Sequence, residues 1–254
     1  MKAHHLETFL GVVIQNCLKD WQIVRLATSA LSCTHLKPLV VNRHLQSILQ
    51  YPQFHKLCAV SGNSETRDAI VDLLHALFHL HPSNTCQITH VEPLVNAYHA
   101  TLSPSDLKLF SIFQLFEEER KLSAAALFSR WSASPLALSS NSLEAIQSLE
   151  PNIVMRTCLH FPKWRRLEDQ SNRSIENHDA QLYDPVFLIL MFGAMLFENP
   201  PVSAFAWVEM FRTNVVGLLI RSLSCKDPRI RDLSLCNLAA LRKSLQVRFA
   251  FCTS

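Results

Sequence analysis

Glycine is scarce in this chain, with only four residues among 254, at positions 11, 62, 193 and 217. Hairpin turns and phosphate-cradling loops both depend on glycine, because it adopts positive φ angles without steric cost. So few glycines disfavour a β-rich fold and a nucleotide-binding P-loop. The sequence also contains no convincing strand pattern, and it therefore predicts an all-α fold.

Apolar runs long enough to cross a bilayer are also lacking. The most apolar block, "LYDPVFLILMFGAMLFENPP", has neither charge nor amide between Val186 and Phe197. A helix of about twelve residues covers about 18 Å, less than the roughly 30 Å hydrocarbon core of a membrane. Asp184 and Pro185 before it are typical of a helix start. We therefore expect a buried helix here and no membrane partner.

Closely spaced cysteine pairs are absent as well. The eight cysteines are scattered, no Cys-x-x-Cys occurs, and the first twenty residues show no secretory signal pattern. A chain without such a signal normally keeps its thiols reduced. We expect the cysteines to be small apolar core residues.

Helix start signals are what the sequence does contain. "SPSD" at 103–106, "EPN" at 150–152 and two "DP" pairs at 184–185 and 227–228 place proline where the first helical residue is expected. With 48% hydrophobic residues the chain is apolar enough to form a core. The patterns predict helices over 6–18, 21–33, 38–50, 64–80, 88–100, 104–119, 121–131, 142–149, 151–160, 184–198, 202–223 and 228–247.

An internal sequence similarity indicates how these helices are organised. When Arg67 is aligned with Arg231, "TRDAIVDLLHAL" matches "IRDLSLCNLAAL" at the Arg-Asp pair and at two leucines. A helix that opens with a hydrophobic residue and arginine resembles the second helix of a HEAT-type repeat. We therefore predict a HEAT/armadillo-like α-solenoid of stacked helical hairpins, with a generic helical domain as the alternative.

A polar stretch divides the expected helices. Residues 162–181, "PKWRRLEDQSNRSIENHDAQ", lack helical periodicity and are rich in Asn, Gln, Ser and Asp. We interpret them as an exposed loop or linker. The predicted organisation is an N-terminal helical-repeat array over 1–161 and a C-terminal helical group over 182–254, stacked on that array.

Four blocks in a fixed order resemble a known family. They are "YHATLSPSDLKLFSIFQLFE" from Tyr98, "SLEPNIVMRTCLHFPKWRRL" from Ser148, "LYDPVFLILMFGAML" from Leu182 and "SLSCKDPRIRDLSLCNLAAL" from Ser222. The set resembles the nucleolar pre-ribosomal-associated protein 1 family over roughly residues 90–245. The resemblance implies a helical-repeat scaffold of the nucleolus and nucleus that acts in large ribosomal subunit assembly and rRNA maturation, in company with a DEAD-box helicase. The family is several times longer, so this chain resembles an internal piece or a truncated product.

Catalytic patterns are weak. His75 and His79 lie four residues apart with His81 nearby, which is a zinc-ligand spacing, but the glutamate of His-Glu-x-x-His is absent. Three consecutive glutamates at 117–119 do not converge on one point of a helix and are typical of a solvated face. We predict a protein that is not an enzyme, with no cofactor and no metal site.

Positive charge is concentrated near the C-terminus. Between Arg212 and Arg248 there are eight basic residues against two acids, although the whole chain has a formal net charge of only +3. The motif "PKWRR" places one tryptophan among cations, as stacking on bases and binding of phosphates would require. We therefore name as candidate RNA-binding residues Lys163, Trp164, Arg165, Arg166, Arg229 and Arg242. The alternative is a solvated basic helix face and loop.

Two functions follow from these observations. The first is a non-catalytic scaffold in nucleolar assembly of the large subunit, which binds pre-ribosomal proteins, precursor rRNA or both. The second is a generic HEAT-like protein-binding adaptor without an RNA role.

Overall fold

The chain folds into helices. The computed structural model describes residues 3–33, 35–59, 64–134, 138–168 and 179–251. These residues form fifteen α-helices and two short 3-10 helices, and the only strand-like pairing among them is an isolated antiparallel bridge between Thr101 and Tyr183. The predicted all-α class is confirmed. None of the helices described is both long and apolar enough to cross a membrane.

The helices group into two compact units. Unit 1 is formed by residues 1–99 and 104–123, and unit 2 by residues 100–103, 124–170 and 174–254. The division between the two units does not coincide with the polar stretch 162–181. Residues 169–178 of that stretch lie outside the described part of the chain.

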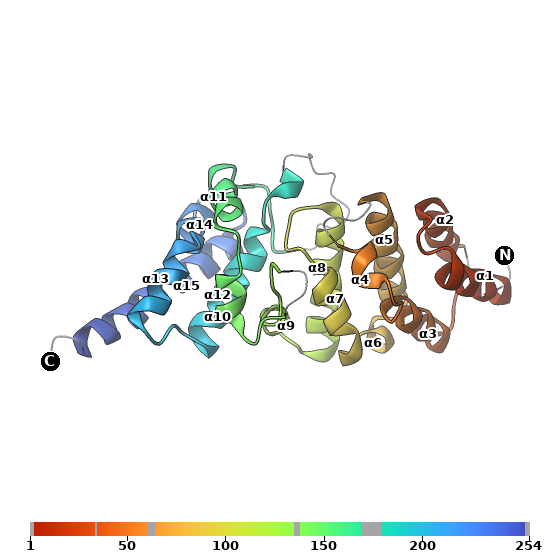
Figure 1. Cartoon of the computed structure of the whole chain (residues 1–254), viewed down its shortest axis with the longest axis horizontal. Coiled ribbons are helices and arrows are strands. Elements are labelled where there is room, and N and C mark those ends of the chain that lie inside the picture. The colour runs from red at the N-terminus through yellow and green to blue at the C-terminus, as the bar shows by residue number, and fades with distance from the viewer. Residues whose placement is uncertain (1–2, 34, 60–63, 135–137, 169–178, 252–254) are drawn as a thin grey trace. The chain divides into compact units, whose positions relative to one another are not determined.

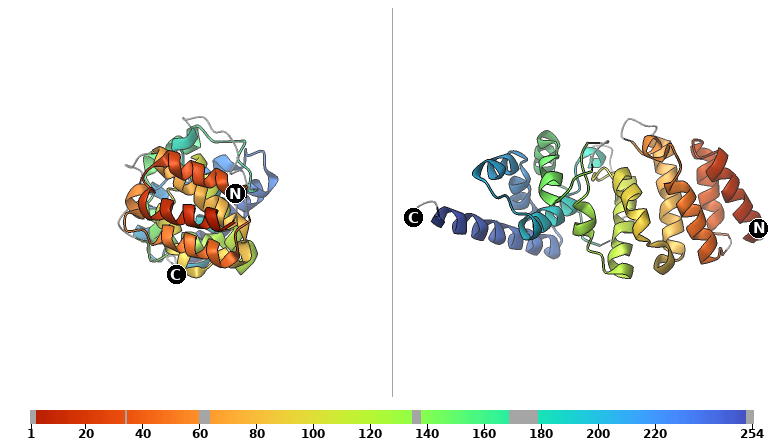
Figure 2. Two further views of the ribbon diagram at one scale, coloured as in Figure 1. Left: turned by 90° about the vertical axis from the view of Figure 1, so that its right-hand side faces the viewer. Right: turned by 60° about the horizontal axis from the view of Figure 1, so that its bottom comes forward.

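Unit 1 is a succession of neighbouring helices. α1 packs against α2 and α3, both of which pack against α5, and α5 packs against α8 (Figures 1 and 2). Leucines 73, 74 and 77 of α5 are fully buried between these neighbours. The elements of unit 1 are α1 (Ala3–Asn16), α2 (Trp21–Leu31), α3 (Pro38–Leu49), α4 (Phe54–Leu57), α5 (Ser64–Leu80), α6 (Pro82–Thr85), η1 (Ile88–His90), α7 (Val91–Ala97) and α8 (Pro104–Arg120).

Unit 2 is built around the apolar block found in the sequence. Its central helix, α12, packs against α9, α10, α14 and α15, and α11 packs against α14 (Figure 1). The elements of unit 2 are α9 (Ala124–Phe128), α10 (Ser142–Gln147), α11 (Pro151–Leu159), η2 (Asp179–Gln181), α12 (Pro185–Glu198), α13 (Ala204–Arg212), α14 (Val215–Ser222) and α15 (Pro228–Phe251).

The burial of α12 is uneven along its length. Val186 to Ile189 are buried, and Phe187 packs its ring edge-on against Phe128 and Trp131, with ring centroids 5.0 and 4.9 Å away. Leu190 is only half-buried, and Phe197 near the end of the helix is 89% exposed. The predicted buried helix is confirmed as far as Met195, while the last two residues of α12, Phe197 and Glu198, are exposed.

All four proline start signals lie at the first residue of a helix, in α8, α11, α12 and α15. Asp184 caps α12, because its Oδ1 accepts a hydrogen bond from the Val186 N–H at 2.9 Å.

The predicted single helix over 202–223 is wrong. It is split into α13 and α14 at Asn214, whose φ of 64° lies in the left-handed region that asparagine tolerates better than most residues.

The two arginines that the internal sequence similarity aligns occupy the same position in their helices. Arg67 is the fourth residue of α5 and Arg231 is the fourth residue of α15. Their contacts differ, because Arg67 is buried and donates to Asp106 and to the Ala97 carbonyl, whereas Arg231 donates to the carbonyls of Cys225 and Lys226. The repeat relationship between the two helices stays a prediction.

Candidate nucleic-acid interface

The candidate site centres on residues 163–168, which we call the basic segment. It follows α11 and a turn closed by a hydrogen bond from the Arg165 N–H to the Pro162 carbonyl at 2.9 Å. Lys163 and Arg166 are exposed, Trp164 is half-buried, and Arg165 is buried with 1% of its surface accessible. Its four predicted RNA-binding residues therefore occupy three different environments.

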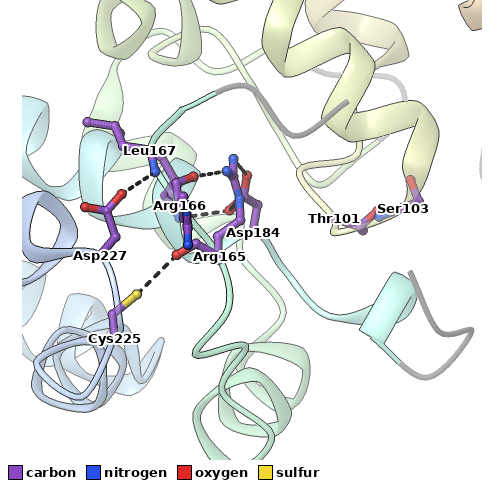
Figure 3. Close-up of polar contacts among 9 residues, drawn as sticks. Thr101, Ser103, Arg165, Arg166, Leu167, Asp184, Cys225 and Asp227 are labelled. Carbon is purple, nitrogen blue, oxygen red and sulfur yellow. Dashed lines mark hydrogen bonds and ion pairs between the residues drawn. The ribbon is translucent and has the colours of Figure 1, made fainter. Parts of the chain in front are cut away.

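Arg165 is turned into unit 2 rather than towards solvent (Figure 3). Its guanidinium makes a bidentate ion pair with the fully buried Asp184, with Nε 3.0 Å from Oδ1 and Nη2 2.8 Å from Oδ2. Nη1 also donates to the carbonyl of Arg166. Because breaking a buried bidentate pair is costly, Arg165 is not available to a phosphate. The expectation that Arg165 belongs to an exposed RNA-binding loop is wrong.

Asp184 connects this ion pair to the start of α12. Its Oδ1 accepts the Val186 N–H as a cap, and its own N–H donates to the Ala100 carbonyl at 2.7 Å. A carboxylate at a helix N-terminus is stabilised by the helix dipole as well as by the arginine. One aspartate thus fixes α12, residue 100 and the basic segment together.

The other end of the basic segment is attached to the start of α15. The Leu167 N–H donates to Asp227 Oδ2 at 2.8 Å (Figure 3). Asp227 Oδ1 also accepts the Arg229 N–H at 2.9 Å. Burial alone would raise the pKa of Asp227, but these backbone hydrogen bonds and the Arg229 side chain lower the pKa below its usual value. Asp227 is therefore held as a carboxylate that joins the segment to α15.

Cys225 adds a third attachment. Its Sγ donates to the Arg165 carbonyl at 3.2 Å, and burial raises the pKa of this thiol. The Lys226 N–H donates to the Lys163 carbonyl at 3.2 Å. The backbone of the basic segment is thus tied to the residues just before α15, and its exposed cations project from a fixed base.

Trp164 keeps a polar partner of its own. Its Nε1 donates to Asp179 Oδ2 at 3.2 Å, and the side chain is half-buried. A base could stack only on the part of the ring that remains accessible.

The two remaining candidates lie in α15 and differ from each other. Arg229 is half exposed and pairs with Glu168 at 3.0 Å and with Asp227 at 3.6 Å, so its charge is already offset. Arg242 is exposed but lies thirteen residues further along the helix, roughly 20 Å away. The structure brings Arg229 to the basic segment and leaves Arg242 apart from it.

Lys226 is the residue that the sequence argument missed. It is exposed, and its backbone contacts that of Lys163. The available signal was its position in "CKDP", directly before a helix start, within the basic stretch. The exposed cations that the fold assembles here are Lys163, Arg166 and Lys226.

The histidine-rich helix end does not form a shared binding site. The rings of His75 and His79 are 4.0 Å apart, and His79 Nδ1 lies 2.8 Å from the His75 carbonyl oxygen. His81 Nε2 instead lies 2.8 Å from the Leu36 carbonyl oxygen. Across the described residues, no group of three or more His, Cys, Asp or Glu side chains could hold a metal ion.

Comparison with known proteins finds two similar sequences. The chain is 26% identical over 208 residues to Nucleolar pre-ribosomal-associated protein 1 of Mus musculus, a match that covers 72% of this chain. It is 26% identical over 212 residues to the protein of the same name from Homo sapiens, which covers 73% of this chain. No protein-family model and no solved structure matches the chain.

The matches place the chain against a short part of a much larger protein. It spans 9% of the length of each of these relatives. The resemblance that the four ordered sequence blocks indicated is confirmed as a similarity to Nucleolar pre-ribosomal-associated protein 1 over about 72% of the chain.

Proposed function

We propose that this chain is a non-catalytic helical part of a nucleolar scaffold that acts in assembly of the large ribosomal subunit and maturation of its rRNA. The observation that supports the proposal is the similarity, over most of the chain, to a protein named for its association with nucleolar pre-ribosomes. Because the chain spans only 9% of that relative, the proposal concerns a local contribution to a larger assembly.

The architecture that suits this role is a stack of HEAT-like helical hairpins. In unit 1 α1 packs against α2 and α3, both of these pack against α5, and α5 packs against α8. Stacks of this kind present long surfaces on which several partners can bind at once. The equal register of Arg67 and Arg231 supports the same architecture.

The proposed RNA contact is made by Lys163, Arg166 and Lys226. All three are exposed, and the basic segment that holds two of them is tied to the starts of α12 and α15. Fixed cations bind phosphates with less loss of side-chain and loop entropy than cations on a free loop. Trp164, at the side of this surface, would add stacking with a single-stranded base.

The proposed partners are those that the family resemblance implies. They are precursor rRNA, other large-subunit assembly factors and a DEAD-box helicase, in the nucleolus. We assign the chain the binding of these partners and no reaction of its own.

Sedimentation of the tagged chain from lysed cells tests the scaffold role. We expect the wild-type chain to travel with precursors of the large subunit in a sucrose gradient. A chain that stays at the top of the gradient while those precursors sediment normally would overturn the proposal. A matched variant with Lys163→Glu, Arg166→Glu and Lys226→Glu separates the two kinds of contact, because unchanged sedimentation would leave only protein partners.

A protein-binding adaptor without an RNA role is the second candidate, and one surface favours it. On α13 three apolar side chains that follow one another at intervals of three residues are exposed to solvent: Phe205, Val208 and Phe211, at 72%, 52% and 40%. Exposed apolar stripes of this kind mark contacts with other proteins.

A further inference from the structure

The long helix α15 displays a second apolar stripe with a regular spacing. Leu235, Leu238, Arg242 and Leu245 follow one another at intervals of three, four and three residues. This spacing places all four along one seam, at the alternating core positions of a coiled-coil heptad. The seam differs from a simple leucine zipper in one respect, because one of its core positions is an arginine.

The seam is accessible. Leu235 is 59% exposed, Leu238 and Leu245 are half-buried, and Arg242 is exposed. An open depression of about 450 Å³ lies along it and is lined by Leu238, Leu241, Arg242, Leu245 and Gln246. Of these lining residues, Leu241 is buried. A side chain from another helix could therefore insert between the leucines.

The face of α15 next to the seam is already anchored in unit 2. Ser234 Oγ and Ser222 Oγ lie 2.6 Å apart, and Asn237 Nδ2 donates to the Ile189 carbonyl at 2.8 Å. Ile230 is buried beside them. These contacts hold the helix by the face that borders the seam. The seam is consequently presented in a fixed orientation.

Charge decides what kind of helix fits there. Between residues 228 and 246 the helix has four basic side chains, at 229, 231, 242 and 243, against the single acid Asp232. The seam itself contains no carboxylate. In a parallel pairing with a second copy, Arg242 would face its own equivalent, and like charges at core positions oppose pairing.

We propose that the Leu235–Leu238–Arg242–Leu245 seam docks an amphipathic helix of a different protein, one that carries aliphatic core residues and a carboxylate opposite Arg242. An aliphatic partner face would cover the three leucines, and the carboxylate would pair with a guanidinium that the contact partly desolvates. The inference rests on the proposed scaffold function for its biological setting. It removes Arg242 from the RNA surface and makes it a determinant of partner choice.

Synthetic peptides of about three heptads can test this seam directly on the full chain. The probe has leucine at its core positions except for one central glutamate, and the matched peptide has lysine there instead. Fluorescence anisotropy should show the glutamate peptide binding roughly tenfold more tightly than the lysine peptide. Arg242→Glu should invert this preference, and Leu235→Asp should weaken both peptides.

Lys243→Glu is the matched control, because residue 243 neighbours Arg242 but lies off the seam. It should leave the glutamate preference unchanged. The proposal would be overturned if the two peptides bound equally, if neither bound, or if Arg242→Glu and Lys243→Glu had the same effect. Binding of single-stranded RNA that depends on Arg242 would overturn it as well. Circular dichroism confirms that each variant is folded. The peptide test measures binding of a helix to the purified chain, whereas the sedimentation test measures whether the chain travels with large-subunit precursors, so the failure of one proposal can be told from the failure of the other.

Discussion

Arg165 and Asp184 form a bidentate ion pair that is closed off from solvent on both sides, with 1% and 0% of the two residues exposed. The carboxylate also caps α12, so the same contact joins the basic segment to the central helix of unit 2. Arg165, predicted from the sequence to bind RNA, thus instead holds the basic segment in place. Its neighbours Lys163 and Arg166 are the exposed cations of the segment.

The first prediction concerns the strength of that anchor. Arg165→Met should lower the free energy of unfolding by about 3–5 kcal/mol, because it leaves the Asp184 carboxylate buried without its partner. Urea denaturation followed by circular dichroism measures the change. Arg212→Met is the matched control, since Arg212 pairs with Glu209 at an exposed site and its loss should cost at most about 1 kcal/mol. Equal losses in the two variants would show that Arg165 is not a structural anchor.

The second prediction separates the two ends of α12. Phe187→Ala should cost about 3–5 kcal/mol, because Phe187 is fully buried against Phe128 and Trp131. Phe197→Ala, the same substitution in the same helix, should change stability by less than about 0.5 kcal/mol, because Phe197 is 89% exposed. Thermal melts of both variants give the comparison. A destabilising Phe197→Ala would mean that the end of α12 is covered by something else.

Most of the fold could be predicted from local signals. Prolines at helix starts and apolar periodicity located the long helices, because both depend on residues within one or two turns of each other. The short helices α4 and α6 were missed, since four residues are too few to show a period. The break at Asn214 was missed as well, because a single left-handed residue leaves the apolar pattern on either side unchanged.

The candidate site could be predicted only in part. The basic segment was found from its composition, but composition does not show which cation turns inwards. Arg165 is buried because an aspartate nineteen residues later lies beside it, and such a pairing exists only once α12 and the segment have packed together. Likewise, Lys226 joins Lys163 through a backbone contact between residues that are distant in the sequence.

The third prediction concerns thiol reactivity. Burial raises the pKa of Cys58 to about 12 and that of Cys86 to about 11, so both remain protonated and poorly nucleophilic at pH 8. Cys33 and Cys236 are exposed. In the folded chain an aromatic disulfide reagent should modify Cys33 and Cys236 rapidly, and Cys58 and Cys86 only after denaturant is added. Mass spectrometry of the modified peptides identifies the sites, and rapid labelling of Cys58 in the native chain would contradict its burial.

The fourth prediction is a pH effect in unit 1. Burial in α3 lowers the pKa of His44 below its usual value, although Glu7 acts in the opposite direction. The unfolded chain therefore takes up a proton more readily than the folded chain, so stability is full above about pH 6.5 and declines as the pH falls below it. His44→Gln should lose less stability than the wild type between about pH 7.5 and 5.5. Parallel slopes for the two proteins in thermal melts would show that His44 does not contribute.

The last prediction tests the RNA surface that remains after Arg165 is removed from it. Each phosphate neutralised by a cation releases counterions, so affinity for single-stranded RNA should fall steeply as salt is added. Replacing Lys163, Arg166 and Lys226 by alanine should flatten the slope of log K against log salt by roughly two units. Titration of fragments of precursor rRNA at several salt concentrations measures both slopes.

The specificity of that slope change depends on a matched set of substitutions. Alanine at Lys56, Arg212 and Lys243 removes the same charge from exposed positions outside the surface, and should leave the slope close to that of the wild type. Trp164→Ala should weaken single-stranded RNA by about 1–3 kcal/mol and leave duplex RNA nearly unchanged, because only an unpaired base can stack on the accessible part of the ring. If both triple variants flatten the slope equally, binding follows net charge, and the basic segment is no more than a packed connection between α12 and α15.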